Sequence, residues 1–349
     1  MATTASTRRQ FLTLLGLSAV SVSCGAATGA PSGKGQTKTL RYQGWAGQVT
    51  PAELAADLGY LEDVKLEWVG NTISGPQDIQ SAATGQVDFG GAFNGAVVKL
   101  AANNAPIKAV ISYYGSDDEA YQGFYVLEDS PIRSPRDLFG KKVGMNTLGG
   151  HAEALLDIYL RRKGLSAAEA GKVEPLVVPP VNTEQALRQK QIEVAVLGGM
   201  LRDKARERGG IRPLFTDTQL LGSFSAGTYV MTNRFLQQNP DTVRTFVTGV
   251  GRALAWSRAT PRDEVIDRMT GIVKRRRRNE DTAALKYWRS FGVATPDGRI
   301  AGKELRLWID WLGDRGDIKK DQVSLSELYT NDFNKAGRGS APSASTSGS

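Results

Sequence analysis

Two loops of this 349-residue sequence place hydroxyl, amide and glycine groups directly before a helix. Ser74-Gly75 precedes a helix expected over residues 75–84, and Asn146 to Gly150 precedes one expected over 151–163. The free N–H groups of a helix start, with the helix dipole behind them, favour a negative ligand group. Glycine allows close backbone approach, and Ser and Thr hydroxyls add donors. The alternative function for Ser74 and Thr147 is ordinary helix capping.

Other candidate binding residues follow the ends of expected strands. Trp45, in a glycine-flanked loop, fits either stacking on a ligand or interior packing. Asn94 is an orienting donor or a turn residue, and of the pair Tyr113 and Tyr114 we favour Tyr114 for ligand contact. The full set of candidate ligand-binding residues is Gln43, Trp45, Ser74, Gly75, Asn94, Tyr114, Asn146, Thr147, Gly149, His151, Gly198 and Tyr229.

The same inventory argues against catalysis, a cofactor or a metal. His151 is the only histidine and Cys24 the only cysteine, so neither finds the partners that a zinc site needs. At a helix start the charged form of His151 is disfavoured, which leaves a neutral hydrogen-bonding role. Neither a Gly-x-Ser-x-Gly elbow nor a phosphate-binding glycine loop is present. We expect no catalytic residue, no cofactor and no metal.

Two charged runs have a functional and a neutral interpretation. Asp117-Asp118-Glu119 would meet an amine if it faced a binding site, but a solvated loop is the more common role of such a run. Lys274 to Arg278 follows an amphipathic stretch, which favours a solvated helix end over a contact with an anionic surface or a partner. The remaining charges are scattered despite the net charge of +8, so we expect no nucleic-acid partner.

The first residues indicate export. Residues 1–23 combine a polar start without acidic residues, the pair Arg8-Arg9, an apolar run of about a dozen residues and then small residues. This is the pattern of a secretory signal, and Thr7 to Leu12 resembles the twin-arginine motif. Cys24 stands where a lipoprotein signal places its acylated cysteine, although Ser21 departs from the usual Leu. We expect a twin-arginine signal over 1–23 and lipidation at Cys24, with a free cysteine as the alternative.

The rest of the chain alternates short apolar runs with helical patterns. This alternation predicts βα units around mainly parallel sheets, because parallel strands need crossover helices. Two prolines in Asp129 to Leu138 interrupt the rhythm, and a second βα series follows. We expect a tether over 24–38, a first lobe over 39–127, a second lobe over 128–226, a return with C-terminal helices over 227–334, and a disordered tail over 335–349. The expected elements include a short strand over 87–89 and a helix over 281–291.

Several motifs occur in the order found in one known family. They include Ala55 to Val64, Thr84 to Gly90, Ala105 to Val110 and Asp137 to Thr147. In this succession the chain resembles the solute-binding proteins of nitrate, sulfonate and taurine ABC importers, from about residue 39 to 232. The resemblance implies a type II periplasmic-binding-protein fold: an α/β protein of two βα lobes with an interlobe cleft and a helical C-terminal part.

The resemblance further implies binding without chemistry. A small polar or anionic solute, such as a sulfonate, nitrate or a carboxylate, would be held in the cleft and delivered to permease subunits driven by a cytoplasmic ATPase. The membrane would be a further partner through the lipid at Cys24, and we expect a monomer. Two alternatives stay open: a ligand-sensing module that signals to a membrane partner, and a thiamine-pyrimidine-precursor protein. The second uses a cysteine-rich motif that this chain lacks.

Overall fold

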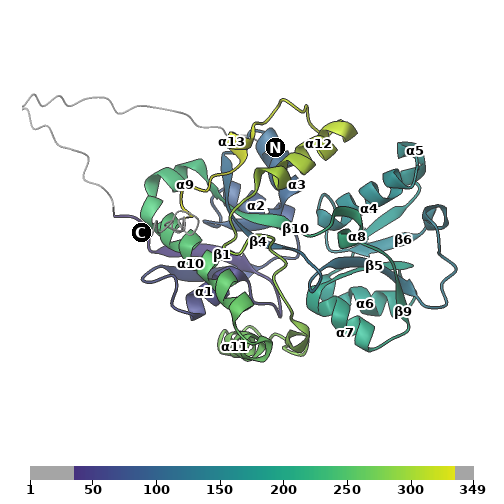
Figure 1. The fold of residues 1–349 in the computed structure, drawn as a ribbon, viewed down its shortest axis with the longest axis horizontal. Coiled ribbons are helices and arrows are strands. Elements are labelled where there is room, and N and C mark those ends of the chain that lie inside the picture. The colour runs from purple at the N-terminus through teal and green to yellow at the C-terminus, as the bar shows by residue number, and fades with distance from the viewer. Residues whose placement is uncertain (1–34, 335–349) are drawn as a thin grey trace, which may run out of the picture. The chain divides into compact units, whose positions relative to one another are not determined.

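Two groups of β-strands, each covered by helices, form the core of residues 35–334 in the computed structural model (Figure 1). We refer to them as lobe 1 and lobe 2. The predicted α/β fold of two βα lobes with a cleft between them and a helical C-terminal part is confirmed. The expected signal, the lipidation at Cys24 and the expected tail over 335–349 lie outside the described residues and stay predictions.

Lobe 1 contains two small sheets. In the first, β1 runs parallel to β2; in the second, β10 lies between β3 and β4 and runs antiparallel to both. Strand β3 is rich in small residues because helix α2 (Gly75–Ala83) packs directly on it: a Cβ on Gly90 would lie 2.5 Å from the Asp78 carbonyl oxygen. These strands are β1 (Thr39–Gly44), β2 (Lys65–Asn71), β3 (Gly90–Phe93), β4 (Ile107–Ser116) and β10 (Phe224–Thr232).

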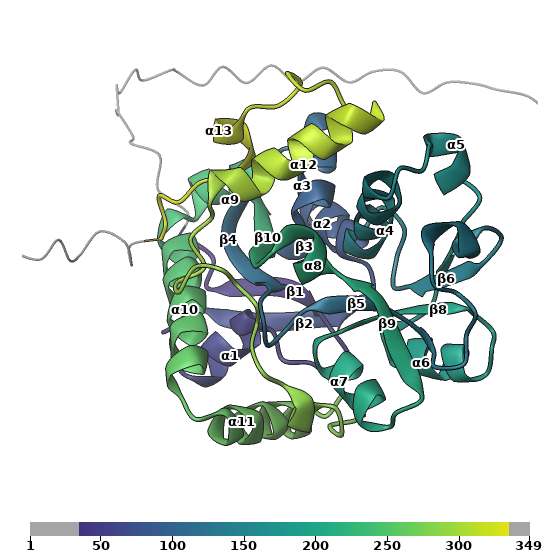
Figure 2. The ribbon, with the colours of Figure 1, turned by 45° about the vertical axis from the view of Figure 1, so that its right-hand side comes forward.

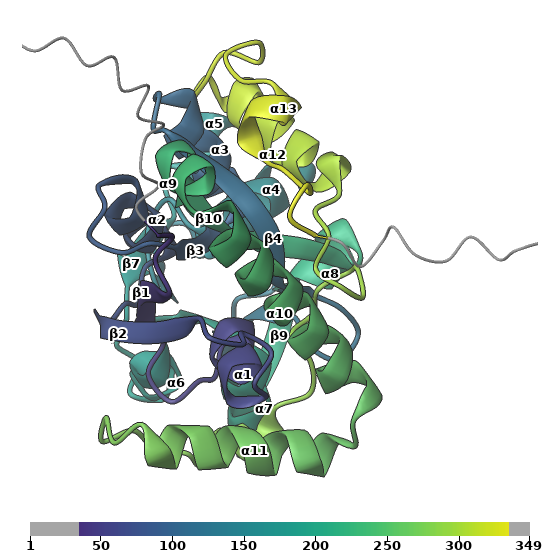
Figure 3. The same cartoon turned by 90° about the vertical axis from the view of Figure 1, so that its left-hand side faces the viewer.

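Helices of both halves of the chain cover these sheets. The 20-residue α10 packs on α1 and β4, and α11, which follows α10 in the chain, runs below α1 and contacts it (Figure 3). Among residues 35–334, no helix has both the length and the apolar character needed to cross a membrane. The helices are α1 (Pro51–Asp57), α2 (Gly75–Ala83), α3 (Asn94–Ala102), α9 (Asn233–Gln238), α10 (Pro240–Ala259), α11 (Arg262–Arg275), α12 (Gly302–Arg315) and α13 (Leu325–Leu328).

Lobe 2 is built on one five-stranded sheet in the order β7-β6-β8-β5-β9, in which β5 runs antiparallel to its two neighbours (Figure 2). Buried apolar side chains lie on both faces of this sheet. Its strands are β5 (Gln122–Leu127), β6 (Lys142–Met145), β7 (Glu174–Val177), β8 (Val194–Gly198) and β9 (Ile211–Thr216). Its helices are α4 (His151–Arg162), α5 (Ala167–Ala170), α6 (Pro180–Arg188), α7 (Gly199–Glu207) and α8 (Asp217–Leu221), with a 3-10 turn over Pro135–Leu138.

The chain passes between the lobes twice, once from β4 to β5 and once from α8 to β10. Both passages come earlier than the sequence predicts. Strand β5 already pairs with β8 and β9, so lobe 2 begins before residue 128. Strand β10 already pairs with β4 at Phe224, so the return begins before residue 227. Of the prolines that suggested a boundary, Pro131 lies in a loop within lobe 2 and Pro135 begins the 3-10 turn there, so they mark only a local break.

Asp217 joins these two passages. Its Oδ2 accepts a hydrogen bond from the Ser116 hydroxyl, at the end of β4, and one from the Gln122 backbone N–H at 3.1 Å, at the start of β5. Its Oδ1 accepts from the Thr218 N–H at 2.7 Å. The residue is fully buried. One carboxylate therefore holds both chain passages at fixed spacing.

Three other sequence predictions are wrong in detail. The strand expected over 87–89 forms over Gly90–Phe93, and the helix expected over 281–291 is only a 3-10 turn over Leu285–Tyr287. The tether expected to reach residue 38 ends earlier: Gln36 and Thr37 hydrogen-bond to the start of α10, for example from Thr37 N to the Asn239 Oδ1 at 2.9 Å. These contacts already belong to lobe 1.

The position of Asp217 predicts a pH dependence of stability. Burial raises the pKa of its carboxyl from the ordinary 3.8 to about 6, so the folded protein holds this proton more tightly than the unfolded chain does. The contribution of the group to stability is present below pH 4 and is lost as the pH rises through about 6. In chemical denaturation, the free energy of unfolding of the wild type should fall by up to about 3 kcal/mol between pH 4 and 7, relative to that of Asp217→Asn. Asp63→Asn, at an exposed carboxylate, is the control; parallel curves for wild type and Asp217→Asn would contradict the assignment.

Candidate functional site

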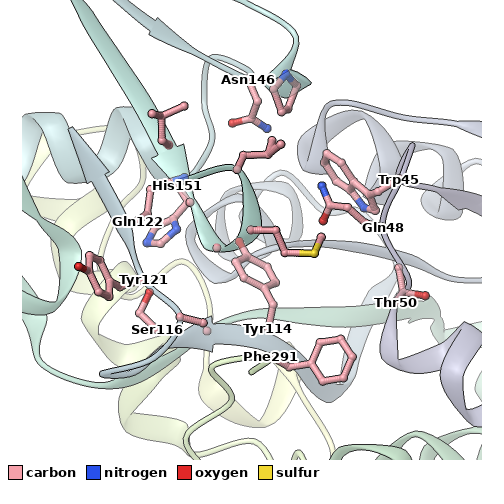
Figure 4. Close-up of a pocket in the computed structure, with 18 of the residues that line it drawn as sticks. Trp45, Gln48, Thr50, Tyr114, Ser116, Tyr121, Gln122, Asn146, His151 and Phe291 are labelled. Carbon is pink, nitrogen blue, oxygen red and sulfur yellow. The ribbon is translucent and has the colours of Figure 1, made fainter. Parts of the chain in front are cut away.

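A cavity of about 320 Å³ lies between the lobes and receives side chains from both (Figure 4). Lobe 1 contributes the loop after β1, the end of β4 and a segment of the C-terminal half. Lobe 2 contributes the starts of α4, α6 and α7. The lining residues that matter most below are Trp45, Tyr114, Gln122, His151, Trp288 and Phe291.

Helix starts converge on this cleft. Gly75 begins α2, His151 begins α4, and Gly198 is the N-cap of α7; all three line the cavity. Neither Gly150 nor Gly198 has a side chain to cap its helix. The partial positive charge of several helix starts therefore faces one cavity, as the sequence analysis expected for two of them.

At one rim of the cleft, which we call the Thr147 rim, the two lobes are in direct contact. The Ser74 and Thr147 hydroxyl oxygens lie 2.9 Å apart, and the Asn146 side-chain amide donates to the Ile73 carbonyl at 2.9 Å. Ser74 also accepts from the backbone N–H of Gln77 at 3.4 Å and so caps α2. The hydroxyls expected to hold a ligand are engaged with each other across the cleft.

The other rim, which we call the Arg289 rim, is ionic. The Arg289 guanidinium donates to Asp203 and to Glu119, both at 3.1 Å, and Lys286 lies 3.5 Å from Glu207. Glu119 borders the cleft, but its side chain is 61% exposed and lies in a loop, as the preferred interpretation of the 117–119 run as a solvated loop expects. The Asp117 carboxylate instead accepts from the Ser290 hydroxyl at 2.7 Å. The acidic run thus joins the first chain passage to the C-terminal half.

The structure brings seven of the twelve predicted residues to the cavity wall: Trp45, Gly75, Tyr114, Asn146, Thr147, His151 and Gly198. The other five do not line it. Ser74 lies just behind Thr147. Asn94 is fully buried and donates to the Ser225 carbonyl at 3.1 Å, and Tyr229 stacks on Tyr113 at 4.1 Å. Gln43 lies within β1, and the Gly149 N–H donates to Glu153 at 2.6 Å.

Several lining residues were not predicted from the sequence: Gln48, Thr50, Ser116, Tyr121, Gln122, Met200, Trp288 and Phe291. For Thr50 a signal existed, because Thr50 and Glu53 form a capping box at the start of α1. Gln48 follows Trp45 in the loop after β1, Met200 lies in the first turn of α7, and the others belong to the first chain passage or to the segment that was expected to be a helix. Their place in the cleft depends on tertiary packing.

His151 sits among aromatic rings. Its ring centroid lies 5.7 Å from that of Phe93, 5.6 Å from Phe224 and 6.3 Å from Tyr114. Burial among these rings lowers its pKa to about 3. The imidazole is therefore neutral throughout the physiological range, in agreement with the role expected from its helix position.

The basic run 274–278 supports the Trp45 loop. Arg276 pairs with Glu53 at 2.9 Å and with Glu280 at 2.7 Å, and also donates to the Trp45 carbonyl at 3.4 Å. Arg278 donates to the Tyr42 hydroxyl at 3.0 Å. The Arg276 side chain is only 8% exposed. The prediction of a solvated helix end is therefore wrong for these two arginines, because acidic residues far apart in the sequence meet them inside lobe 1.

No group of three or more potential metal-ligating His, Cys, Asp or Glu side chains occurs within residues 35–334. The carboxylates at the cleft are already held by arginine, which leaves no open cluster of oxygen ligands at the Arg289 rim. The site that the structure presents is a cleft lined mainly by aromatic and neutral polar side chains, with Glu119, Asp203 and Arg289 at one rim.

Two α/β lobes joined by two passages, with a cleft between them, define the class of protein: the periplasmic-binding-protein fold. The family model described as "NMT1/THI5 like" matches residues 46–264, and the chain belongs to this family. Among solved structures, the periplasmic aliphatic sulphonate-binding protein SsuA of Escherichia coli superimposes with a TM-score of 0.62 at 19% identity, over 85% of this chain and 93% of SsuA. The periplasmic nitrate-binding protein NrtA of Synechocystis gives 0.65 at 13% identity, over 85% and 87%. At these identities the likeness concerns the fold.

Relatives found by sequence match only part of this chain and part of their own length. A protein of Brucella abortus, named as a binding protein, is 24% identical over 213 residues, which is 60% of this chain and 63% of the relative. A 4-amino-5-hydroxymethyl-2-methylpyrimidine phosphate synthase of Aspergillus parasiticus is 26% identical over 223 residues, with the same shares. The chain thus matches less than two thirds of the length of these relatives.

The network behind Trp45 predicts unequal effects of two neighbouring arginines. Arg276→Ala leaves Glu53 and Glu280 buried without their main partner, and should lower the free energy of unfolding by about 3–5 kcal/mol. Arg275, whose side chain is 64% exposed beside Asp57, is the matched control. Arg275→Ala should lower it by about 1 kcal/mol or less. Urea denaturation of the two variants tests this, and equal losses would contradict the proposed role of the network.

Proposed function

We propose that this protein is the extracytoplasmic solute-binding component of an ABC importer, which captures a small polar or anionic solute and delivers it to a membrane permease. The observation that carries this proposal is the cleft: one cavity lined by residues of both lobes, with several helix starts around it. A volume of about 320 Å³ suits a small molecule. Hinge closure between two lobes is a known means of capture.

Binding without chemistry agrees with what lines the cavity. Its only imidazole is neutral, and the carboxylates Glu119 and Asp203 are engaged by Arg289. Neither arrangement offers an activated nucleophile with a general base beside it. The ligand-binding residues that we propose are the seven predicted ones at the cavity wall, together with Gln48, Gln122 and Phe291.

The proposal includes the route to the membrane. Arg8-Arg9 and the apolar run that follows support export by the twin-arginine pathway, and Cys24 supports a lipid anchor that would hold the protein beside its permease. Loss of solute uptake in a strain lacking this protein, restored by the full-length chain, would support transport. Intact uptake with a lost transcriptional response would favour the ligand-sensing alternative.

A second candidate function, synthesis of a thiamine pyrimidine precursor, is favoured by the similarity to the Aspergillus enzyme and by the position of His151 in the cleft. The single cysteine of the chain speaks against it. If the protein used its own histidine as a substrate in such a synthesis, the mass of the peptide containing His151 would fall after incubation with the other substrates. We expect this mass to stay unchanged.

Solute binding can be tested by thermal unfolding of the mature protein with a panel of sulfonates, carboxylates, nitrate and neutral polar molecules. A solute at 100 times its dissociation constant should stabilise the protein by about 2.7 kcal/mol. Trp45→Ala and Thr147→Ala should remove most of the shift given by the best solute. Trp68→Ala, at an exposed tryptophan outside the cleft, is the matched control and should keep it. A full shift in both cleft variants would refute the placement of the site.

A further inference from the structure

The charged side chains of the cleft are already paired. Among the described residues that line it, Arg289 is the only cationic one, and it contacts both Asp203 and Glu119 at 3.1 Å. Asp203 also accepts from the buried Arg202 at 2.7 Å. An ionised solute would have to break these pairs or be held without a side-chain counter-charge, with only the partial charges of the helix starts to offset it, and burial of an unpaired charge is unfavourable.

The groups that the sequence suggested for an anion are also engaged. The backbone N–H of Gly149, before α4, donates to the Glu153 carboxylate at 2.6 Å, which puts a negative charge at this helix start. The hydroxyls of Ser74 and Thr147 bond to each other. A second anion in the same place would be repelled by Glu153.

Three polar atoms of lining residues remain buried without a hydrogen-bond partner in the part of the chain that the structure describes. They are Gln122 Oε1, His151 Nε2 and Trp288 Nε1. Such atoms are rare in folded proteins, and at a cleft they indicate what a ligand would supply. The glutamine oxygen needs a donor, and the indole N–H needs an acceptor. The neutral imidazole supplies either one. A simple inorganic anion carries no donor for Gln122.

The walls between these atoms are aromatic. Figure 4 shows Gln122 and His151 on one side of the pocket, Trp45 and Gln48 on the other, and the Tyr114 and Phe291 rings between and below them. Aromatic faces favour a flat unsaturated molecule, which stacks on them or meets them edge to face.

We propose that the cleft takes an uncharged, flat, unsaturated-ring solute that presents both an N–H donor and an oxygen or nitrogen acceptor, and that it discriminates against an ionised anion of the same shape. This inference rests on the proposed function and names the solute class for the same site. Gln122 is the residue that selects for the donor, while His151 and Trp288 complete the polar contacts. The aromatic rings select for a flat molecule by stacking on it or meeting it edge to face.

Pairs of compounds that differ in charge but little in shape test the inference. They are benzenesulfonamide and benzenesulfonate, nicotinamide and nicotinate, and benzamide and benzoate, each titrated at pH 7 by calorimetry into the mature protein. We expect at least one neutral member to bind, about tenfold or more tighter than its anion. Equal or tighter binding of the anions overturns the inference.

A variant pair isolates the role of Gln122. Gln122→Leu removes the unpartnered acceptor and should weaken the best neutral ligand about tenfold or more, with little change for its anionic partner. Gln43 also has a buried unpartnered Oε1 but lies outside the cavity wall, so Gln43→Leu is the matched control and should keep wild-type affinity. Equal losses in the two variants, at equal unfolding temperatures, overturn the assignment to Gln122.

The experiment separates this inference from the proposed function. If only anions bind, from these pairs or from a panel with nitrate and alkanesulfonates, the solute class is wrong and the solute-binding function stands. If no neutral member binds, the inference fails whatever the anions do. If neither set binds, and native mass spectrometry of protein purified from cells detects no bound small molecule, the proposed function itself fails.

Discussion

The arrangement of the cleft depends on how two passages of the chain are held together. Asp217 accepts hydrogen bonds from Ser116 at the end of β4 and from Gln122 at the start of β5, and it belongs to the second passage itself. Ser116 and Gln122 also line the cavity. A single buried carboxylate therefore connects the joint between the lobes to two side chains of the cavity wall, the surface that we propose for solute binding.

The rest of the wall is supported from behind by charge pairs inside lobe 1. Arg276 holds the Trp45 carbonyl while its guanidinium pairs with Glu53 and Glu280, and Glu280 in turn accepts from the Gly47 N–H at 3.1 Å. Buried pairs of this kind add little net stability compared with apolar packing, but they fix geometry. The Trp45 loop thus owes its position to a segment more than two hundred residues away.

The sequence predicted what is encoded locally. Helix starts with Thr, Ser or Gly and the alternation of strands and helices gave the two-lobed fold and seven cleft residues. It failed where tertiary contacts decide. The strand at Gly90 is made of small residues because α2 packs on it, so it lacks the β-branched pattern that marks a strand. The segment over 281–291 has helical composition but crosses to α7, where Arg289 and Lys286 find acidic partners. Gln122 was missed because only the paired sheet of lobe 2 brings it to the cleft.

The two rims of the cleft join protein atoms to protein atoms, through Ser74 and Thr147 on one side and Arg289 with its carboxylates on the other. Such contacts favour closure whatever molecule lies between the lobes. A protein that already spends much of its time closed binds its solute with a smaller conformational penalty, because apparent affinity scales with the fraction of molecules in the binding-competent form. The same preference for the closed form would slow the dissociation of the solute. Under the proposed function, release of the solute would require these rim contacts to break, which points to the surface where the lobes meet as the place for a transport partner to act.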